Sequence, residues 1–305
     1  MFFTPCQATL LQPYSSVNAA EYSVMRATPF IMRLMIGGFF RPKDPSFGTD
    51  VAGRVEAVGE NVKQFRPGDE VFGCAKGAFA EYVLAREAYL APKPANKSFA
   101  QAAAVPVAAL TALQGLRGAG GIQPGQEVLI QGASGGVGMF AVQLAKVFEA
   151  EVTAVCSTKN LDMARSLGAD HVIDYTQEDF TRNPQRYDLI FAVNGYHPLS
   201  AYKRALKPQG IYICAGGTLP QIFQAMLLGK LMSKKDGKKM ASMGIAKVVQ
   251  KDMITLGELL EVGKITPVID RCYPLSEVPE AIRYVEEKHA QGKVVITLES
   301  KDNTR

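Results

Sequence analysis

Four glycines lie within one short turn of the chain, at positions 132, 135, 136 and 138 of the segment QGASGGVGMFAVQLAK (131–146). The turn joins an apolar run to a stretch whose apolar residues have helical spacing. Such a turn leaves backbone N–H groups unpaired at the helix N-terminus, and these groups bind anions. Glycine suits this turn because a Cβ would collide with a pyrophosphate and because the backbone needs φ angles that other residues resist. The segment therefore indicates a phosphate-binding turn.

Two catalytic chemistries and one inert alternative fit this turn. The dinucleotide fingerprint G-x-G-x-x-G appears as ASGGVG (133–138), with alanine in the first place, and a second strand follows about 20 residues later. The same residues match the G-x-S-x-G elbow of α/β-hydrolases, with Ser134 as nucleophile and Asp270 and His289 following in the required order. His289 lies in a charged segment that we expect to face water, which disfavours the hydrolase. The inert alternative is a glycine turn that binds no ligand.

The residues that follow the second strand, CSTKN (156–160), indicate which dinucleotide would bind. An NAD-binding protein normally presents Asp or Glu here to the ribose 2′-hydroxyl, and a carboxylate would repel a 2′-phosphate. Lys159 and the Ser157 hydroxyl can instead bind a 2′-phosphate through charge-assisted and neutral hydrogen bonds. The alternative is that Lys159 is an ordinary surface lysine. The segment favours NADPH over NADH.

The composition is that of a globular chain of about two domains. The 305 residues are 47% hydrophobic and 21% charged, and no apolar run approaches the roughly 20 residues that span a bilayer. The N-terminus lacks the pattern of a signal peptide, so we expect a cytoplasmic protein. The cysteines form no CxxC pair and the histidines have no metal-type spacing, which argues against a zinc knuckle or a disulfide framework. The net charge of +5 suits an anionic ligand without demanding nucleic acid, and we expect no nucleic-acid partner.

The elements that must position these residues change in character near residue 95. Before it, strand-like pieces separated by turn signals are typical of a small, mostly β domain. These pieces are residues 50–59, 66–73 and 78–85. Residues 91–98 are expected to form a connector, and 100–116 a helix that is interrupted or kinked at Pro106.

From residue 126 onward, strands and helices alternate. The expected strands are 127–132, 151–156, 171–174, 188–193 and 211–216. Residues 137–148 place apolar side chains on one face of a helix, and a second helix that begins at 161 is ended by Gly168. Repeated strand-helix-strand units imply a parallel sheet with right-handed crossovers. Residues 292–299 form one more strand, which the pattern assigns to neither domain.

The motif series resembles the zinc-free branch of the medium-chain dehydrogenase/reductase superfamily, the quinone oxidoreductase and enone reductase group. The segments that carry the resemblance are GTDVAGRVEAVG, RPGDEVFG, AFAEYV, AAAVPVAALTALQGL, GASGGVGMFAVQLAK, LGADHVIDY and GKVVITL. The chain is especially similar to chloroplast-envelope quinone oxidoreductase homologues and their bacterial relatives. The resemblance implies an α/β protein with a GroES-like, mostly β catalytic domain at 1–95, completed by 262–305. It further implies a Rossmann domain with a doubly wound parallel sheet at 96–261, an active site between the two domains, and a homodimer.

The resemblance also assigns site residues. Those assigned to the pyrophosphate are Ser134, Gly135, Gly136, Val137 and Gly138. Those assigned to the surroundings of the 2′-phosphate are Ser157, Lys159 and Tyr175. Those assigned to the nicotinamide side are Thr111, Asn194, Gly216 and Gly217. Asn18 matches a position near the reacting end of the cofactor, where its amide could hold the ribose or a substrate oxygen; the alternative is an asparagine that caps a loop.

Zinc-dependent members of the superfamily place a cysteine and a His-Glu pair at positions where this chain differs. Asn18 stands in place of the cysteine, and Thr49 and Asp50 stand in place of the His-Glu pair. An amide, a hydroxyl and scattered thiols cannot hold Zn²⁺ tetrahedrally, so we expect no metal. Without a Lewis acid, the expected chemistry is hydride transfer to the activated C=C of an α,β-unsaturated carbonyl or to a quinone. Ser23 stands where some quinone reductases carry a tyrosine, so no proton donor is predicted.

Two further segments bear on the interpretation. Fifteen residues precede the segment SVNAAE (16–21), fewer than in similar proteins, so we expect N-terminal strands of the catalytic domain to be missing. Residues 228–251 concentrate lysines among methionines and leucines, which is compatible with weak peripheral contact with an anionic membrane or with a solvated charged loop.

The sequence therefore predicts an NADPH-dependent, zinc-free oxidoreductase that acts on small enones or quinones. A non-catalytic NADPH-binding protein, either a sensor or a truncated remnant, is the alternative from another class, because the N-terminus is short and no acid or base is evident. An α/β-hydrolase with Ser134 as nucleophile is the third possibility.

Overall fold

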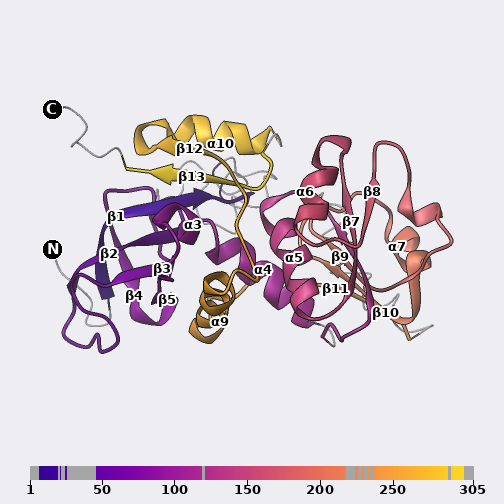
Figure 1. Cartoon of the computed structure of the whole chain (residues 1–305), viewed down its shortest axis with the longest axis horizontal. Helices are drawn as coiled ribbons and strands as arrows, with labels where there is room; N and C mark the ends of the chain where they lie inside the picture. The colour runs from indigo at the N-terminus through magenta and orange to yellow at the C-terminus, as the bar shows by residue number, and fades with distance from the viewer. Residues whose placement is uncertain are drawn as a thin grey trace. The chain divides into compact units, whose positions relative to one another are not determined.

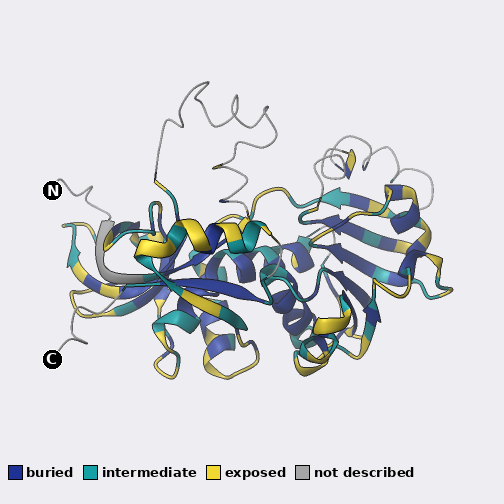
Figure 2. Cartoon of the chain, turned by 90° about the horizontal axis from the view of Figure 1, so that it is seen from above, coloured by how far each residue is buried: buried dark blue, intermediate teal, exposed yellow. Residues whose placement is uncertain are grey.

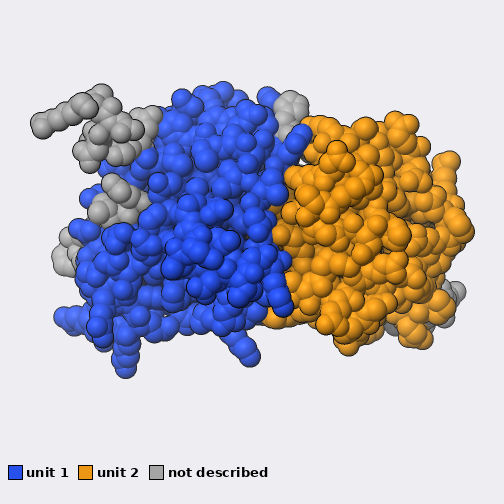
Figure 3. All heavy atoms as spheres, viewed as in Figure 1, with its two compact units in different colours: residues 1–108, 248–305 blue, residues 109–247 orange. Residues whose placement is uncertain are grey.

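The computed structural model describes residues 7–19, 21, 25, 46–118, 121–217, 224–225, 229, 233, 237–287 and 290–298, with the backbone alone for residues 7–13. Contacts divide the chain into two compact units. Unit 1 comprises Met1–Ala108 and Val248–Arg305, and unit 2 comprises Ala109–Lys247 (Figure 3). The sequence analysis placed the domain boundaries at residues 96 and 261. Unit 1 extends beyond both of them, to Ala108 and from Val248 onward.

Unit 1 is built on a mostly antiparallel sheet (Figure 1). Its strands are β1 (Gln7–Val17), β2 (Asp50–Val58), β3 (Glu70–Cys74), β4 (Tyr82–Arg86), β5 (Leu90–Pro92), β12 (Ile269–Pro274) and β13 (Lys293–Thr297). They are ordered β12-β13-β1-β2-β3-β5, with β4 paired to β1. The strands predicted at 50–59, 66–73 and 78–85 are confirmed as β2, β3 and β4, whereas β1, β5 and β12 were not predicted.

Strand β1 links the two parts of this sheet. Its first residues pair with β2 and β4, and Ser15–Val17 pair with β13. One apolar cluster of unit 1 includes Val51, Val71 and Val83 from β2, β3 and β4, and another joins β1 and β13 to a C-terminal helix through Val17 and Val294. The C-terminal strand predicted at 292–299 thus belongs to unit 1.

The helices of unit 1 pack against this sheet. They are α3 (Phe99–Ala103), α9 (Gln250–Glu261) and α10 (Val278–Glu286), with short 3₁₀ turns η1 (Glu87–Tyr89) and η5 (Leu275–Glu277). The helix predicted over 100–116 is divided, because α3 ends at Ala103 and α4 (Pro106–Arg117) begins at the proline.

Helix α9 lies in unit 1 rather than in the Rossmann domain to which the predicted boundary at 261 assigned it. The side chain of Gln250 donates hydrogen bonds to the carbonyl oxygens of Leu90 (3.0 Å) and Glu87 (3.2 Å). A Cβ on Gly257 would lie 3.4 Å from the ring of Phe72, so this face of the helix packs directly against β3. These contacts join residues far apart in the sequence, and local patterns do not reveal them.

Unit 2 contains a parallel sheet of six strands in the order β11-β10-β9-β6-β7-β8 (Figure 1). The strands are β6 (Glu127–Gln131), β7 (Glu151–Cys156), β8 (His171–Asp174), β9 (Tyr187–Ala192), β10 (Leu206–Cys214) and β11 (Lys239–Ser242). Its helices and 3₁₀ turns are α4, α5 (Gly136–Val147), η3 (Thr158–Asn160), α6 (Leu161–Ser166), η4 (Phe180–Arg182) and α7 (Leu199–Ala205). The five predicted strands are confirmed, and β11 is an additional one.

The connections make this sheet doubly wound. Helices α5 and α6 lie on one face and α7 lies on the other (Figure 1). The chain runs outward from β6 through β7 and β8, then crosses to β9 on the other side of β6. The connections that leave β6 and β9 therefore diverge at the carboxyl ends of these strands, and in such folds ligands bind at this edge. The predicted Rossmann architecture is confirmed.

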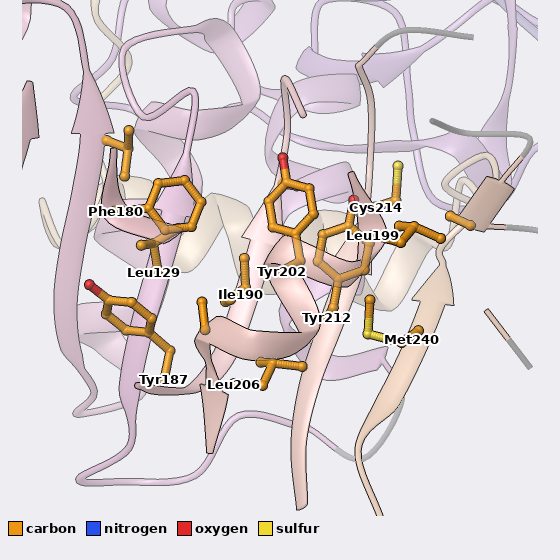
Figure 4. Close-up of a cluster of buried hydrophobic side chains, with 14 of the residues drawn as sticks. Leu129, Phe180, Tyr187, Ile190, Leu199, Tyr202, Leu206, Tyr212, Cys214 and Met240 are labelled. Carbon is orange, nitrogen blue, oxygen red and sulfur yellow. The ribbon is translucent and has the colours of Figure 1, made fainter. Parts of the chain in front are cut away.

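The central strands β6, β7 and β9 of this sheet are buried on both faces, as is typical of parallel strands. Figure 2 shows the buried residues concentrated in the strands and the exposed residues in the loops and on outer helix faces. On one face, Tyr187, Tyr202 and Tyr212 pack with Leu129 and Phe180 (Figure 4). The helix α5 buries eight consecutive residues from Gly138 to Ala145, which fixes the turn in front of it against the sheet.

Candidate functional site: a dinucleotide cradle and a buried polar cluster

Backbone hydrogen bonds to β7 hold the turn between β6 and α5. Gly132 has φ +80°, and the N–H groups of Gly132 and Ala133 both donate to the carbonyl oxygen of Val155 at 3.1 Å. A Cβ on Gly138 would lie 2.0 Å from the carbonyl oxygen of Gly132, so only glycine lets α5 meet the strand. The first N–H groups of α5 have no acceptor within the helix. The turn therefore presents N–H donors at the carboxyl edge of the sheet, where an anion can bind.

Gly135 differs from the other glycines of this turn. A Cβ at this position would meet nothing closer than the Gly132 carbonyl oxygen at 3.5 Å, which is an ordinary contact distance, and its φ of −81° is accessible to any residue. Neither packing nor backbone geometry requires a glycine here. An open space in front of the helix N-terminus fits the close approach of a pyrophosphate, which a side chain would obstruct.

The predicted 2′-phosphate residues lie at the ends of β7 and β8. Ser157 follows β7 and is partly buried, while Lys159 is exposed and makes no ion pair with a described residue. Tyr175 follows β8 and is 49% exposed. The two strands pair in parallel, with Cys156 beside Asp174, so these three residues emerge at the same edge of the sheet.

Asp174 is a carboxylate at this edge that the sequence analysis did not consider. It accepts hydrogen bonds from Thr158 Oγ1 (2.5 Å) and from the backbone N–H of Thr176 (2.9 Å). The hydrogen bond from the Thr158 hydroxyl is the main cause that lowers the pKa of Asp174. The carboxylate is therefore ionised at neutral pH, and the neighbouring threonines occupy its oxygens. The parallel register of β7 and β8 could have pointed to it.

Asn160 connects the two halves of this edge. Its side-chain amide donates hydrogen bonds to Ser134 Oγ (3.0 Å) and to Ser157 Oγ (3.2 Å). One serine comes from the turn after β6 and the other from the turn after β7. The sequence analysis named the segment that contains Asn160 but gave the residue no role.

The residues predicted on the nicotinamide side follow β9 and β10. A Cβ on Gly132 would lie 3.1 Å from the Cβ of Asn194, which is exposed. Gly217 has φ +129° and pairs with Gly195 in an isolated bridge, and a Cβ on Gly216 would lie 2.3 Å from the carbonyl oxygen of Val193. These residues therefore meet the glycine turn at one edge. Thr111 lies in α4 and is half-buried.

Asn18, the residue predicted nearest the chemistry, belongs to a buried polar cluster in unit 1. Lys293 Nζ donates to Asn18 Oδ1 (2.6 Å) and lies 3.2 Å from Asp50 Oδ2. Asn18 Nδ2 donates to the same Asp50 oxygen at 2.8 Å and to the carbonyl oxygen of Ser16 at 3.4 Å. The Ser16 hydroxyl also donates to Asp50 Oδ2, at 2.5 Å. The amide of Asn18 is thus occupied within the protein, and its contact with a substrate stays a prediction.

Glu21 is a second carboxyl group in this cluster. Its Oε2 accepts the backbone N–H of Asn18 at 2.9 Å, while Oε1 is buried without a hydrogen-bond partner among the described residues. Burial, reinforced by the charge of Asp50 and opposed by the Asn18 N–H and by Lys293, raises the pKa of Glu21 from 4.5 to about 7. Glu21 therefore holds a proton over part of the physiological pH range. The sequence offered no sign of it beyond its place three residues after Asn18.

The positions that hold zinc in related dehydrogenases have other partners here. Asp50 is committed to Lys293 and Asn18, and its Oδ1 accepts the backbone N–H of Val107 at 2.8 Å. Among the residues that the structure describes, no three His, Cys, Asp or Glu side chains gather in a way that could hold a metal ion.

The residues predicted for a hydrolase have other hydrogen-bond partners in the structure. The Ser134 oxygen accepts from an asparagine amide, which cannot act as a base. Asp270 lies in unit 1, where it accepts a hydrogen bond from the hydroxyl of Tyr284 at 2.7 Å. His289 lies outside the described residues.

The basic stretch at 228–251 is described at residues 229, 233 and 237–251, which include β11 and the first residues of α9. Its interpretation as a membrane-contacting patch stays a prediction. Within the described part of the chain, no helix combines the length and the apolar character that crossing a membrane would require.

Known proteins resemble this chain in both of its parts. The family described as the alcohol dehydrogenase GroES-like domain matches residues 9–95, and the family described as zinc-binding dehydrogenase matches residues 167–296. The quinone-oxidoreductase QR1, chloroplastic, of Triphysaria versicolor is 35% identical over 278 residues, which cover 86% of this chain and 83% of the relative.

Two further comparisons extend this likeness. The 2-methylene-furan-3-one reductase of Solanum lycopersicum is 37% identical over 82% of this chain, and the match spans only 62% of that protein's length. Among solved structures, the quinone oxidoreductase from Coxiella burnetii superposes with a TM-score of 0.84 at 28% identity, over 97% of this chain and 91% of that one.

Proposed function

Because the chain belongs to the medium-chain dehydrogenase/reductase superfamily, we propose that it is an NADPH-dependent oxidoreductase that reduces small α,β-unsaturated carbonyl compounds or quinones. Its relatives include a quinone oxidoreductase and a 2-methylene-furan-3-one reductase. Both classes of substrate carry an electron-poor conjugated system that accepts hydride. The proposal includes chemistry without zinc and a homodimer, as the sequence resemblance implies, and a cytoplasmic location.

The observation that carries the proposal is the edge formed by the ends of β6, β7 and β8. The N–H groups at the start of α5 and the space in front of Gly135 suit a pyrophosphate. Ser157 and Lys159 follow β7 in the position where an NAD-binding protein would place a carboxylate. Asp174 lies nearby, but its oxygens accept hydrogen bonds from Thr158 and Thr176. A 2′-phosphate would therefore meet an exposed lysine and a serine hydroxyl.

The chain's own contribution to the reaction is to bind and orient. NADPH held at this edge supplies a hydride to the β-carbon of an enone or to a quinone. The turn before α5 would hold the pyrophosphate, and Asn194, Gly216 and Gly217 would bound the path toward the nicotinamide. In unit 1, Asp50 and Lys293 fix the Asn18 amide in one orientation. Protein contacts of this kind act by positioning the reactants.

The test compares nucleotide binding by the wild-type protein and by Lys159→Glu. We expect NADPH to raise the melting temperature more than NADH does, and the substitution to weaken NADPH binding about a hundredfold, since it replaces a charge-assisted contact by repulsion. NADH binding should change only a few-fold. Lys247→Glu, which alters an exposed lysine elsewhere in unit 2, is the matched control.

Two results would contradict the proposal. Equal losses of affinity for NADPH and NADH in Lys159→Glu would contradict the assignment of Lys159 to the 2′-phosphate. If the wild-type protein bound neither nucleotide, the prediction of a nicotinamide cofactor would be wrong. Turnover of a panel of enones and quinones then separates an enzyme from a protein that only binds NADPH. Binding without any turnover would support the non-catalytic alternative.

A further inference from the structure

Asn160 occupies an unusual position for a polar side chain at the cofactor edge. It is only 5% exposed, and it bridges two turns that come from different strands. Its Nδ2 donates to Ser134 Oγ and to Ser157 Oγ, so both protons of the amide group are used. These two serines are the hydroxyls expected at the pyrophosphate and at the 2′-phosphate, respectively.

The direction of these hydrogen bonds determines what the serines can do. A hydroxyl group has one proton to donate and two lone pairs that accept. Because each serine oxygen accepts from Asn160, each serine proton is left to be donated elsewhere. A hydroxyl proton that points into an anion site forms a charge-assisted hydrogen bond with a phosphate oxygen.

We propose that Asn160 is a positioning residue that orients the hydroxyl protons of Ser134 and Ser157 toward the phosphate groups of NADPH. This inference rests on the proposed function, since it assumes that the dinucleotide binds at this edge. A single side chain, that of Asn160, would then affect binding at two phosphate sites, which belong to separate strand-to-helix turns.

A second observation supports this role. Asn160 is the N-cap residue of α6, yet its side chain makes no capping hydrogen bond. Asparagine at an N-cap normally accepts an N–H of the first helical turn, which stabilises the helix by about 1 kcal/mol. Here the side chain instead reaches across to the serines, and its Oδ1 is buried without a hydrogen-bond partner among the described residues. The fold forgoes a local stabilisation to keep the amide directed at the two hydroxyls.

A neighbouring hydroxyl shows the opposite arrangement. Thr158 Oγ1 donates its proton to Asp174, so that proton is not available to a phosphate. The edge therefore distinguishes three adjacent hydroxyls: those of Ser134 and Ser157 can donate outward, whereas that of Thr158 is consumed by a carboxylate. The identity of the partner, an amide or a carboxylate, decides the outcome in each case.

The substitution Asn160→Asp tests the inference, because it exchanges the donor for an acceptor of the same shape. Both serines would then donate to the new carboxylate and turn away from the cofactor. We expect NADH, which meets Ser134 alone, to bind about tenfold more weakly, and NADPH, which meets both serines, about a hundredfold more weakly. Isothermal titration calorimetry of the wild-type and variant proteins with each nucleotide measures both ratios.

The control is Gln177→Glu, which adds the same charge on the exposed loop after β8 without touching either serine. Electrostatic repulsion alone would make the two variants alike, and that result would overturn the inference. An unchanged affinity of Asn160→Asp for both nucleotides would also overturn the inference. It would mean that Asn160 Oδ1 already faces the serines in the wild-type protein and accepts their protons. A wild-type protein that binds neither nucleotide would instead refute the proposed function.

A second pair of variants keeps the test decisive if Asn160→Asp does not fold. Ser157→Ala should lower the affinity for NADPH and leave that for NADH nearly unchanged. Adding Asn160→Ala to Ser157→Ala should then weaken both nucleotides by the same few-fold factor, since only Ser134 remains to be oriented. If Asn160→Ala instead lowers the NADPH affinity further than the NADH affinity in that background, Asn160 does not act through Ser157.

Discussion

Replacing Glu21 by glutamine should make the protein more stable at neutral and alkaline pH and should change the slope of stability against pH. In the folded protein, burial raises the pKa of this carboxyl from 4.5 to about 7. Between these two values the unfolded chain releases the proton while the folded chain retains it. Stability from this group is therefore fully present below pH 4.5 and is lost as the pH rises toward 7.

The size of the effect follows from the shift. Each pKa unit corresponds to about 1.4 kcal/mol, so the wild-type protein should lose about 3 kcal/mol of unfolding free energy through Glu21 when this range is crossed. Glutamine does not ionise and can still accept the Asn18 N–H, and it should remove this loss. Urea unfolding of the wild-type and Glu21→Gln proteins at pH 5, 6, 7 and 8 yields the difference as a function of pH.

The difference between the two proteins isolates Glu21 from every other titrating group. We expect the stability of Glu21→Gln relative to the wild type to rise by about 2 to 3 kcal/mol from pH 5 to pH 8. Glu56→Gln, at an exposed position of β2, controls for the change of functional group. A difference that stays constant over this range would refute the assignment of a proton to the buried carboxyl, whatever its sign.

Two further pairs of substitutions probe the buried polar cluster and the glycine turn. Lys293→Met should destabilise the protein by about 3 to 5 kcal/mol, because it leaves the buried carboxylate of Asp50 without its ion pair. Adding Asp50→Asn should recover part of that loss in urea unfolding, and no recovery would contradict the pairing. Gly138→Ala should lower the melting temperature of the protein without nucleotide, since its Cβ would lie 2.0 Å from a carbonyl oxygen. Gly135→Ala should leave the melting temperature without nucleotide nearly unchanged and abolish the rise that NADPH causes. If Gly135→Ala also lowers the melting temperature without nucleotide, as Gly138→Ala does, the space before α5 is not the pyrophosphate site.

The sequence predicted the elements of unit 2 well because the relevant information is local. An apolar run of three residues (128–130), a glycine turn and a helical apolar face follow one another directly in β6 and α5. The parallel arrangement of the strands then follows from the general rules of crossover connections. Strand β12 and helix α9 were not predicted, because their positions depend on partners elsewhere in the chain, such as β13 and Leu90.

The same contrast separates the residues of the site. The glycines and Lys159 could be recognised because each stands in a motif. The partners of Asn18 could not, since Asp50 is 32 residues away and Lys293 is 275 residues away in the sequence. The register between β1 and β13, in which Val17 lies beside Val294, brings Lys293 next to Asn18. No local pattern encodes this register.

One residue type illustrates how far a motif can be interpreted. The glycines at 132, 135 and 138 look alike in the fingerprint, yet in the structure each position differs in whether and why it requires a glycine. Gly132 needs a left-handed backbone, Gly138 needs a close approach to a carbonyl, and Gly135 needs neither. Only the last leaves room that the protein itself does not use. A fingerprint therefore mixes residues that build the turn with residues that admit the ligand, and the absence of a structural need is what identifies the second kind.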